Sequence, residues 1–330
     1  MKTPFKILTG ILITLSLPLN GLVFSDILID IDLTDEESGP AETILNTGSL
    51  EGDFEAEFDI PSIETVDGVN AVSLDGNNDW YIGPDASLLT GNTNRSVEAW
   101  VWNPSVPSEE TIFAWGRRGG PDASNFSMLY GNHPSYGALG AWGGNADMPF
   151  YPGGGAPEPN EWHHMVLTYN SQSNERSIYV DGELTNSENN GSFFDTHEFD
   201  DSGLALTMVI GNQNEPNGTR TDALSADLSI AKIKVHDTVL TESDVLDSFN
   251  LDKIKFGKGG PEIISFEASE NTVGPDETVT FTWEIDGAET ISIDNDIGDV
   301  SDIEEIDVTI EETTIFTISA TDSNGMNQSE

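Results

Sequence analysis

Cysteine is absent from all 330 residues, and basic residues are scarce. The absence of cysteine excludes disulfides, thiolate metal sites and a cysteine nucleophile. Lys and Arg total 12 against 59 Asp and Glu, a formal net charge of −47. This field repels nucleic acid and anionic lipid, so we expect neither as a partner. The acid excess has two open interpretations: attraction of divalent cations, or general solvation of the chain in a saline environment.

Long hydrophobic runs are also absent, except near the start of the chain. Residues 1–25 combine Lys2 and Lys6 with an apolar stretch that ends in small residues before Asp26. This pattern predicts a secretory signal peptide and a protein that is secreted or held at the cell surface. The alternative, an N-terminal anchor, requires about 20 cleaner apolar residues. No later segment has that character, so we expect no membrane insertion after signal cleavage.

The most informative stretch is Glu161–Gly182, EWHHMVLTYNSQSNERSIYVDG. Apolar residues alternate with mixed ones from His164 to Tyr169, and the alternation resumes around Ile178. The polar run between them predicts a turn. Asp181-Gly182 predicts a second, tight turn because both residue types tolerate positive φ. The stretch therefore predicts an antiparallel hairpin.

His163 and His164 within this hairpin invite a metal or catalytic interpretation. Adjacent strand residues point to opposite faces of a sheet, so the two rings cannot easily ligate one ion. We therefore expect buried, hydrogen-bonded histidines beside a core Trp162.

Three motifs together resemble a known family. They are WHHMVLTY with IYVDG in the hairpin, LDGNNDW at 74–80, and EAWV at 98–101. Each is similar to a strand signature of laminin-G-like domains in the concanavalin A-like lectin/glucanase superfamily. The resemblance implies an all-β fold, with a concanavalin A-like jelly-roll β-sandwich over residues 26–250.

The last part of the chain has a different sequence pattern. Residues 251–260 contain three lysines and end in Gly-Gly, as expected of a linker. Residues 261–330 carry short alternating segments around Trp283 and resemble a bacterial immunoglobulin-like domain, a second and smaller β-sandwich. The last strand of such a domain is not evident after Gly325.

The glycine-dense stretch Thr111–Tyr151 is the predicted carbohydrate site. Aromatic faces beside amide, guanidinium and carboxylate groups provide the stacking area and planar hydrogen-bond partners that sugars require. The candidate ligand-binding residues are Trp115, Arg117, Arg118, Asn125, Tyr130, His133, Trp142 and Asp147. The alternative is that these residues pack glycine-rich strands. The same choice, platform or core, applies to Trp100 and Trp102, which share one face of a predicted strand.

A calcium ion is the one cofactor that the sequence suggests. Asp75, Asn77 and Asp79 lie at i, i+2 and i+4, a spacing that suits a hard cation, and Asp227 could join them from a later strand. The alternative is a simple turn, because the Glu that completes an EF-hand-type loop is missing.

Three functions remain open at this level. The favoured one is a non-catalytic module, not an enzyme, that binds a glycan or a component of the cell surface or matrix; its oligomeric state stays open. The second is an adhesin that binds protein. The third is a glucanase, which needs two glutamates on one strand face about 5–5.5 Å apart. The nearest string, Glu305–Glu311, has one residue too many and lies outside the predicted jelly roll.

Overall fold

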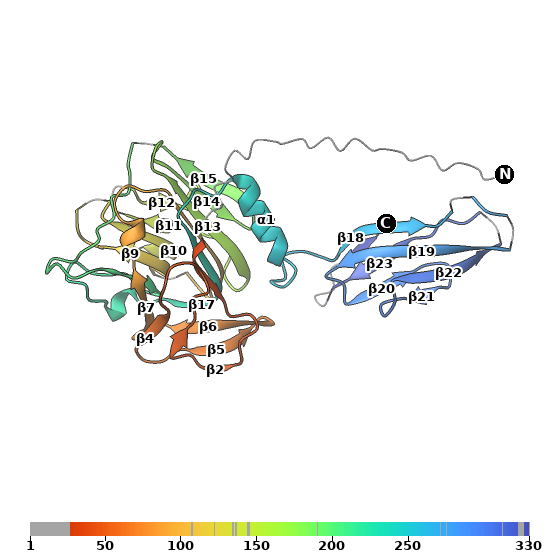
Figure 1. The fold of residues 1–330 in the computed structure, drawn as a ribbon, viewed down its shortest axis with the longest axis horizontal. Helices are drawn as coiled ribbons and strands as arrows, with labels where there is room; N and C mark the ends of the chain where they lie inside the picture. The colour runs from red at the N-terminus through yellow and green to blue at the C-terminus, as the bar shows by residue number, and fades with distance from the viewer. Residues whose placement is uncertain are drawn as a thin grey trace, which may run out of the picture.

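The computed structural model describes residues 27–329 apart from positions 107, 122, 134, 136, 144, 145, 190, 271, 275, 312 and 323–326. The predicted signal peptide at 1–25 lies outside the described residues. Figure 1 shows two β-rich bodies joined by the segment that follows α1. No helix in the described part of the chain is long and apolar enough to cross a bilayer.

The first sheet of the larger body has the order β15-β14-β13-β8-β17-β6-β5-β2, with β1 also paired to β17. We call it sheet A. Its strands are β1 (Ile27–Asp32), β2 (Gly39–Pro40), β5 (Ser62–Val66), β6 (Val69–Asp75), β8 (Arg95–Trp102), β13 (Trp162–Asn170), β14 (Glu175–Val180), β15 (Glu183–Glu188) and β17 (Asp227–His236).

The second sheet, sheet B, has the order β12-β11-β10-β9-β16-β7-β4-β3. Its strands are β3 (Thr43–Ile44), β4 (Phe54–Phe58), β7 (Asp79–Asp85), β9 (Thr111–Gly116), β10 (Asn125–His133), β11 (Gly137–Trp142), β12 (Met148–Pro149) and β16 (Thr207–Ile210). The 3₁₀ turns Ser87–Leu89 and Asp222–Leu224 lie in the connections. The antiparallel sheets enclose one hydrophobic core, which is the predicted jelly-roll β-sandwich.

Strand β8 carries large or branched apolar side chains on both faces. Val97, Ala99 and Val101 belong to the core between the sheets, whereas Trp100 and Trp102 lie on the outer face of sheet A. The alternation predicted for this strand is confirmed. A sheet with large rings on its outer face needs a second cover there, because exposed apolar area is costly in water.

The predicted hairpin is confirmed in detail. Strands β13 and β14 pair antiparallel, with Met165 opposite Val180 and Asn170 opposite Glu175. Asp181 and Gly182 have φ of 51° and 79°, the conformation of a two-residue hairpin turn between β14 and β15. Trp162 is buried, as expected.

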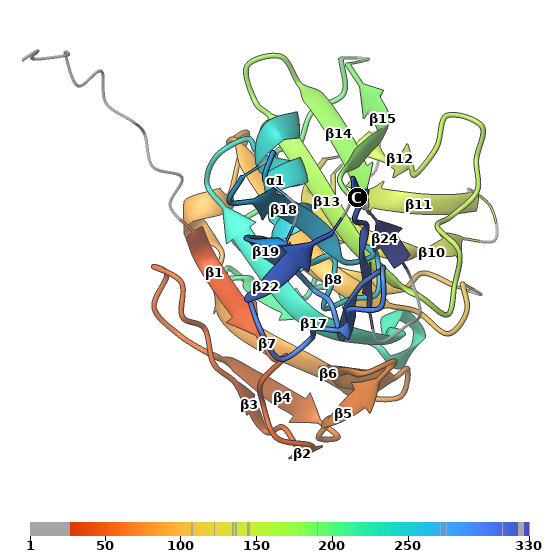
Figure 2. The same cartoon turned by 90° about the vertical axis from the view of Figure 1, so that its right-hand side faces the viewer.

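Helix α1 (Glu242–Asp252) and the segment after it provide part of the outer cover (Figure 2). Thr241 and Asp244 form a capping box at its start. Val245 packs with Val166 and Tyr179 of sheet A. Beyond the helix, the Phe256 ring stacks on the Trp100 ring with centroids 4.0 Å apart and planes 4° apart.

The smaller body holds two further sheets, in the orders β18-β19-β22 and β21-β20-β23-β24. Phe281, Trp283 and Ile318 lie in its separate core. A short strand that was not evident in the sequence after Gly325 is present, because Asn327–Ser329 pairs with β23 through backbone hydrogen bonds that need no apolar pattern. The strands are β18 (Glu262–Ala268), β19 (Glu277–Asp286), β20 (Thr290–Ile293), β21 (Gly298–Asp299), β22 (Glu305–Ile310), β23 (Ile318–Thr321) and β24 (Asn327–Ser329).

The stack on Trp100 leads to a stability prediction. Phe256→Ala should lower the free energy of unfolding by about 3 kcal/mol, because it removes a buried ring and leaves a cavity. Leu251→Ala is the control, since Leu251 is 77% exposed where Phe256 is 3% exposed. Urea unfolding followed by tryptophan fluorescence measures both variants, and equal small losses would show that the segment after α1 does not hold the cover.

Candidate functional site

Three residues of the predicted carbohydrate site are inside the protein. Trp115 and Tyr130 are 0% exposed and Asn125 is 3% exposed. Their prediction as ligand-contacting residues is corrected, because a fully buried ring has no face to offer a sugar. Trp115 and Tyr130 point into the core between the sheets, with Phe113 and Phe126.

A buried cation explains how the Trp115 environment is built. The guanidinium of Arg95 lies 5.6 Å from the centre of the Trp115 ring and 5.5 Å from that of Phe126. The Trp115 indole N–H donates to the Leu89 carbonyl oxygen at 3.1 Å. Arg95 was not predicted from the sequence, and only its place at the start of β8, the strand that carries Trp100 and Trp102, could have suggested it.

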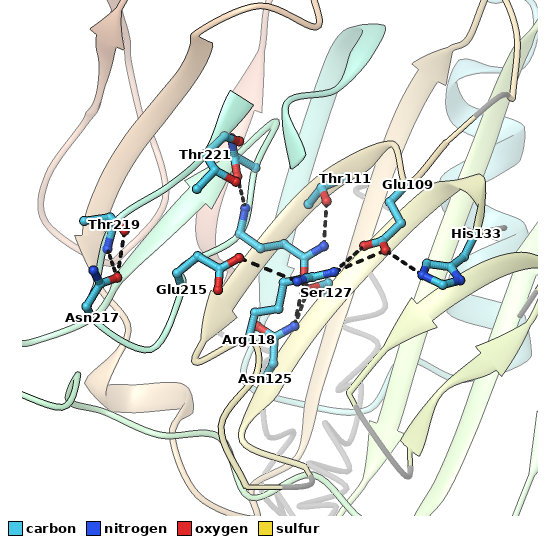
Figure 3. A network of polar contacts seen from close by, with 12 residues as sticks. Glu109, Thr111, Arg118, Asn125, Ser127, His133, Glu215, Asn217, Thr219 and Thr221 are labelled. Carbon is cyan, nitrogen blue, oxygen red and sulfur yellow. Dashed lines mark hydrogen bonds and ion pairs between the residues drawn. The ribbon is translucent and has the colours of Figure 1, made fainter. Parts of the chain in front are cut away.

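Arg118, His133 and Trp142 do come together, on the outer side of sheet B. The Arg118 guanidinium lies 5.7 Å from the centre of the Trp142 ring, and the His133 ring centroid lies 5.4 Å from that of Trp142. Glu109 contacts both Arg118 and His133, at 3.2 and 3.3 Å, and Glu215 lies 3.5 Å from Arg118 (Figure 3). The charged groups of this cluster are therefore paired with one another.

A buried amide network lies behind the cluster (Figure 3). Gln213 Oε1 accepts hydrogen bonds from Asn125 Nδ2 and Ser127 Oγ, and its Nε2 donates to Thr111 Oγ1, each at 3.0 Å. These bonds tie the loop after β16 to β9 and β10. Their observed role is to hold that loop on the sheet.

The other two predicted residues are also engaged. Arg117 pairs with Asp201 at 2.8 Å, and Asp147 accepts the Gly143 backbone N–H at 2.8 Å. The eight residues therefore do not form one continuous surface.

The predicted histidine positions are confirmed. His163 Nδ1 lies 2.8 Å from Asp181 and its Nε2 lies 3.0 Å from the Glu158 carbonyl oxygen. His164 faces the other side of the sheet, where its Nε2 lies 3.3 Å from the buried Glu98 carboxylate. Both rings are held by hydrogen bonds in separate places.

The residues predicted to bind calcium form a turn. Asp75 accepts the Asn77 backbone N–H at 2.9 Å. Asp79 accepts the Asp75 backbone N–H with one oxygen and the Ser225 hydroxyl, at 2.9 Å, with the other. Asp227 lies opposite Asp75 in the β6–β17 ladder. Asp79 is 4% exposed and accepts a hydrogen bond on each oxygen, which favours the simple turn. The described residues contain no group of three or more acids or histidines placed to hold a metal, and calcium binding by this set stays a prediction.

A groove opens on the outer face of sheet A, beside the part that Phe256 covers. Its floor is a cross-strand row in which Ser62 is opposite Ser73, Ser73 opposite Ser229, and Ser229 opposite Trp102. Directly opposed residues point to the same face. The Ser73 and Ser229 hydroxyls are 2.9 Å apart. Three small side chains next to a large ring leave a hollow.

The groove is a cavity of about 530 Å³. One wall is half-buried Trp102 with Pro104, and another is the segment Asp59–Pro61 that leads into β5. The remaining lining includes Glu64, Asp75, Asp79 and Asp227. Strand alternation in the sequence predicted that Trp102 shares a face with Trp100. Nothing in the sequence indicated that serines from three separate strands would lie in one row beside it.

The geometry defines a class: a two-sheet antiparallel jelly roll with a groove on the outer face of one sheet. The sequence of residues 75–246 matches the family described as the concanavalin A-like lectin/glucanases superfamily, and this match spans just over half of the chain. The chain belongs to that superfamily.

Solved structures with a similar fold include domain 4 of AbnA, a GH43 extracellular arabinanase from Geobacillus stearothermophilus, in complex with arabinotriose. It is 16% identical with a TM-score of 0.48, over 68% of this chain and 98% of that one. The binding domain of Paraclostridial Mosquitocidal Protein 1 is 10% identical with a TM-score of 0.46, over 89% and 75%. The receptor-binding domain of botulinum neurotoxin D is 11% identical with a TM-score of 0.45, over 89% and 86%. No curated protein sequence matches the chain.

The buried carboxyl of Asp79 gives a pH prediction. Burial, and then the charge of Asp75, raise the pKa of Asp79 to about 6. The folded state thus favours the protonated form, so this group stabilises the fold below pH ~4 and that contribution is lost as the pH rises through about 6. Asp79→Asn is neutral at every pH. Its amide oxygen can accept the Asp75 backbone N–H, and its amide N–H can donate to the Ser225 hydroxyl oxygen, which reverses the direction of that bond.

We expect Asp79→Asn to raise the free energy of unfolding above pH ~7 by about 1–2 kcal/mol, with the difference fading near pH ~4. Urea titrations at both pH values measure this. Asp85→Asn, at the exposed end of the same strand, is the matched control. A variant that is less stable than the wild type at both pH values would contradict the assignment.

Proposed function

We propose that this protein is an exported, non-catalytic binding module that recognises carbohydrate through the Trp102 groove on the outer face of sheet A. One observation carries the proposal: an aromatic ring stands at the end of a row of hydroxyls, over a cavity large enough for one or two sugar rings. The aromatic–polar face expected from the sequence is thereby assigned to a different sheet.

The chemistry of the groove suits a pyranose. An indole face stacks on the apolar C–H face of a sugar ring, and ring hydroxyls need acceptors and donors at the edges. Ser73 and Ser229 offer hydroxyls on the floor, and Asp75 and Asp227 offer carboxylate acceptors at one end. Stacking and edge hydrogen bonds can then be made together.

The aromatic wall is held in place before any ligand arrives. Trp102 packs with Trp162 and Val66 on the outer face, and the Trp162 indole N–H donates to the Val66 carbonyl oxygen at 3.1 Å. A ring fixed in this way loses little conformational entropy when a ligand binds.

Glycoside hydrolysis is the second candidate, favoured by the raised pKa of Asp79 in the same groove. A general acid of a glycosidase has a raised pKa near a second carboxylate. Asp79, however, is 4% exposed and accepts hydrogen bonds on both oxygens, which favours a structural role. Release of reducing ends from polysaccharides, lost in Asp79→Asn, would support hydrolysis over binding alone.

Protein adhesion is the third candidate. Phe58 and Leu204 are 70% and 68% exposed and line one cavity of about 350 Å³ beside Arg220. Exposed apolar side chains grouped around a polar rim are typical of protein contact sites. Binding to cells or matrix protein that is lost in Phe58→Ser, without any glycan signal, would favour this function.

We also infer that residues 261–330 form the immunoglobulin-like spacer expected from the sequence. The strand orders β18-β19-β22 and β21-β20-β23-β24 support it, because they match the two-sheet division of that fold. Secretion or surface display rests on the signal-peptide pattern of residues 1–25, and mass spectrometry of the exported protein would locate its cleavage.

Trp102→Ala tests the binding proposal. It should abolish signals on a glycan array while leaving the far-UV circular dichroism spectrum unchanged, because Trp102 is only half-buried. The matched control is Trp142→Ala, a half-buried tryptophan on sheet B, which should keep the array signal. If Trp142→Ala removes binding and Trp102→Ala does not, the site lies on sheet B.

A further inference from the structure

We propose that the Trp102 groove selects glycans that carry protonated amines, with glucosamine-type sugars as the class of ligand. This inference rests on the proposed carbohydrate function and specifies its substrate. It depends on the groove having an aromatic wall, a hydroxyl floor and a rim of carboxylates that no basic side chain neutralises.

The lining is chemically one-sided. Asp59, Glu64, Asp75, Asp79 and Asp227 line the groove, and no Lys, Arg or His does so among the described residues. An acidic lining alone says little in a chain with 59 acids and 12 bases. The positions of the available cations are more informative.

Several bases outside the groove are paired with other acids. Arg220 pairs with Glu57 at 2.6 Å, Lys232 with Asp252 at 2.8 Å, and Lys258 with Glu161 at 3.0 Å. Within the described part of the chain, the four exposed carboxylates of the groove form no ion pair. They are therefore open to a cation supplied by a ligand.

The carboxylates also repel one another. Asp75 and Asp227 are cross-strand partners, and the backbone N–H of Asp227 donates to Glu110 at 2.6 Å. Like charges directly opposite in a ladder are unfavourable. Partial desolvation beside the groove, and then the charge of Asp75, raise the pKa of the exposed Asp227 carboxyl. A bound ammonium group would relieve this repulsion.

Trp102 makes the expected cation an organic one. The Trp102 ring is opposite Ser229 of β17 in the ladder, and Asp227 lies two residues before Ser229 in the same strand. The Trp102 ring and the Asp227 carboxylate therefore lie on the same face of the sheet. A sugar ring stacked on the indole can direct an amino substituent toward that carboxylate, and the ammonium gains from the indole face as well. A bare metal ion would use neither the ring nor the serine row.

The experiment is calorimetric titration of the full chain with two probes: the β-1,4-linked glucosamine tetramer and its fully N-acetylated counterpart. We choose a pH of about 6, at which exposed carboxylates are ionised. The amino tetramer should bind at least about tenfold more tightly, from one cation–π contact and one or two partly screened ion pairs. This advantage should shrink in 1 M salt, where the Debye length is about 3 Å.

Glu64→Gln and Asp227→Asn should each move the affinity for the amino tetramer toward that for the acetylated one. Glu183→Gln is the matched control, because Glu183 is an exposed glutamate on β15 at the far end of the same sheet. Glu183→Gln should leave the preference for the amino tetramer unchanged. If Glu183→Gln weakens that preference as much as Glu64→Gln does, the preference arises from the general negative charge of the protein, and the inference is overturned.

The remaining outcomes separate the two proposals. Equal affinity for both tetramers overturns amine selectivity and leaves carbohydrate binding supported. Binding of uncharged glycans on an array, with no response to either tetramer, does the same. No response to any glycan overturns the proposed function and this inference together.

Discussion

The structure depends on covering the outer face of sheet A. Strand β8 points Val97 and Ala99 toward the core and Trp100 outward, so a single partner layer cannot bury the apolar side chains on both faces of the sheet. Sheet B covers the inner face, and α1 with Phe256 covers part of the outer one. The cover stops short of Trp102, and the groove begins where it stops. The proposed site is therefore the uncovered remainder of a face that the fold otherwise buries.

Much of the fold could be predicted from local pattern. Alternation along Trp162–Asn170 determines which side chains enter the core, and the Asp181-Gly182 pair determines the turn after β14. The capping box at Thr241 is equally local, since the four residues from Thr241 to Asp244 contain the whole interaction. These features depend on neighbours in the chain, which a single sequence displays.

The candidate site was less predictable, because it depends on neighbours in space. In the glycine-dense stretch, the pairings of β10 with β9 and with β11 both shift register after Met128, so strand alternation cannot be carried along β10. The Trp115 ring is buried by Arg95, a residue from another strand. Composition indicated the right kinds of residue there, and Arg118, His133 and Trp142 did cluster, but composition could not determine which of them would face solvent.

The groove depends on register in a stricter sense. Ser62, Ser73, Ser229 and Trp102 come from four strands, and only their alignment in one row creates a hollow beside a ring. A shift of one residue in any of these strands would move its serine, or Trp102 in β8, to the opposite face and would turn a core residue outward. The contacts that stabilise the core therefore also position the groove. Core substitutions in β6 or β17 that disturb pairing should then reduce ligand binding even where they lie on the inner face.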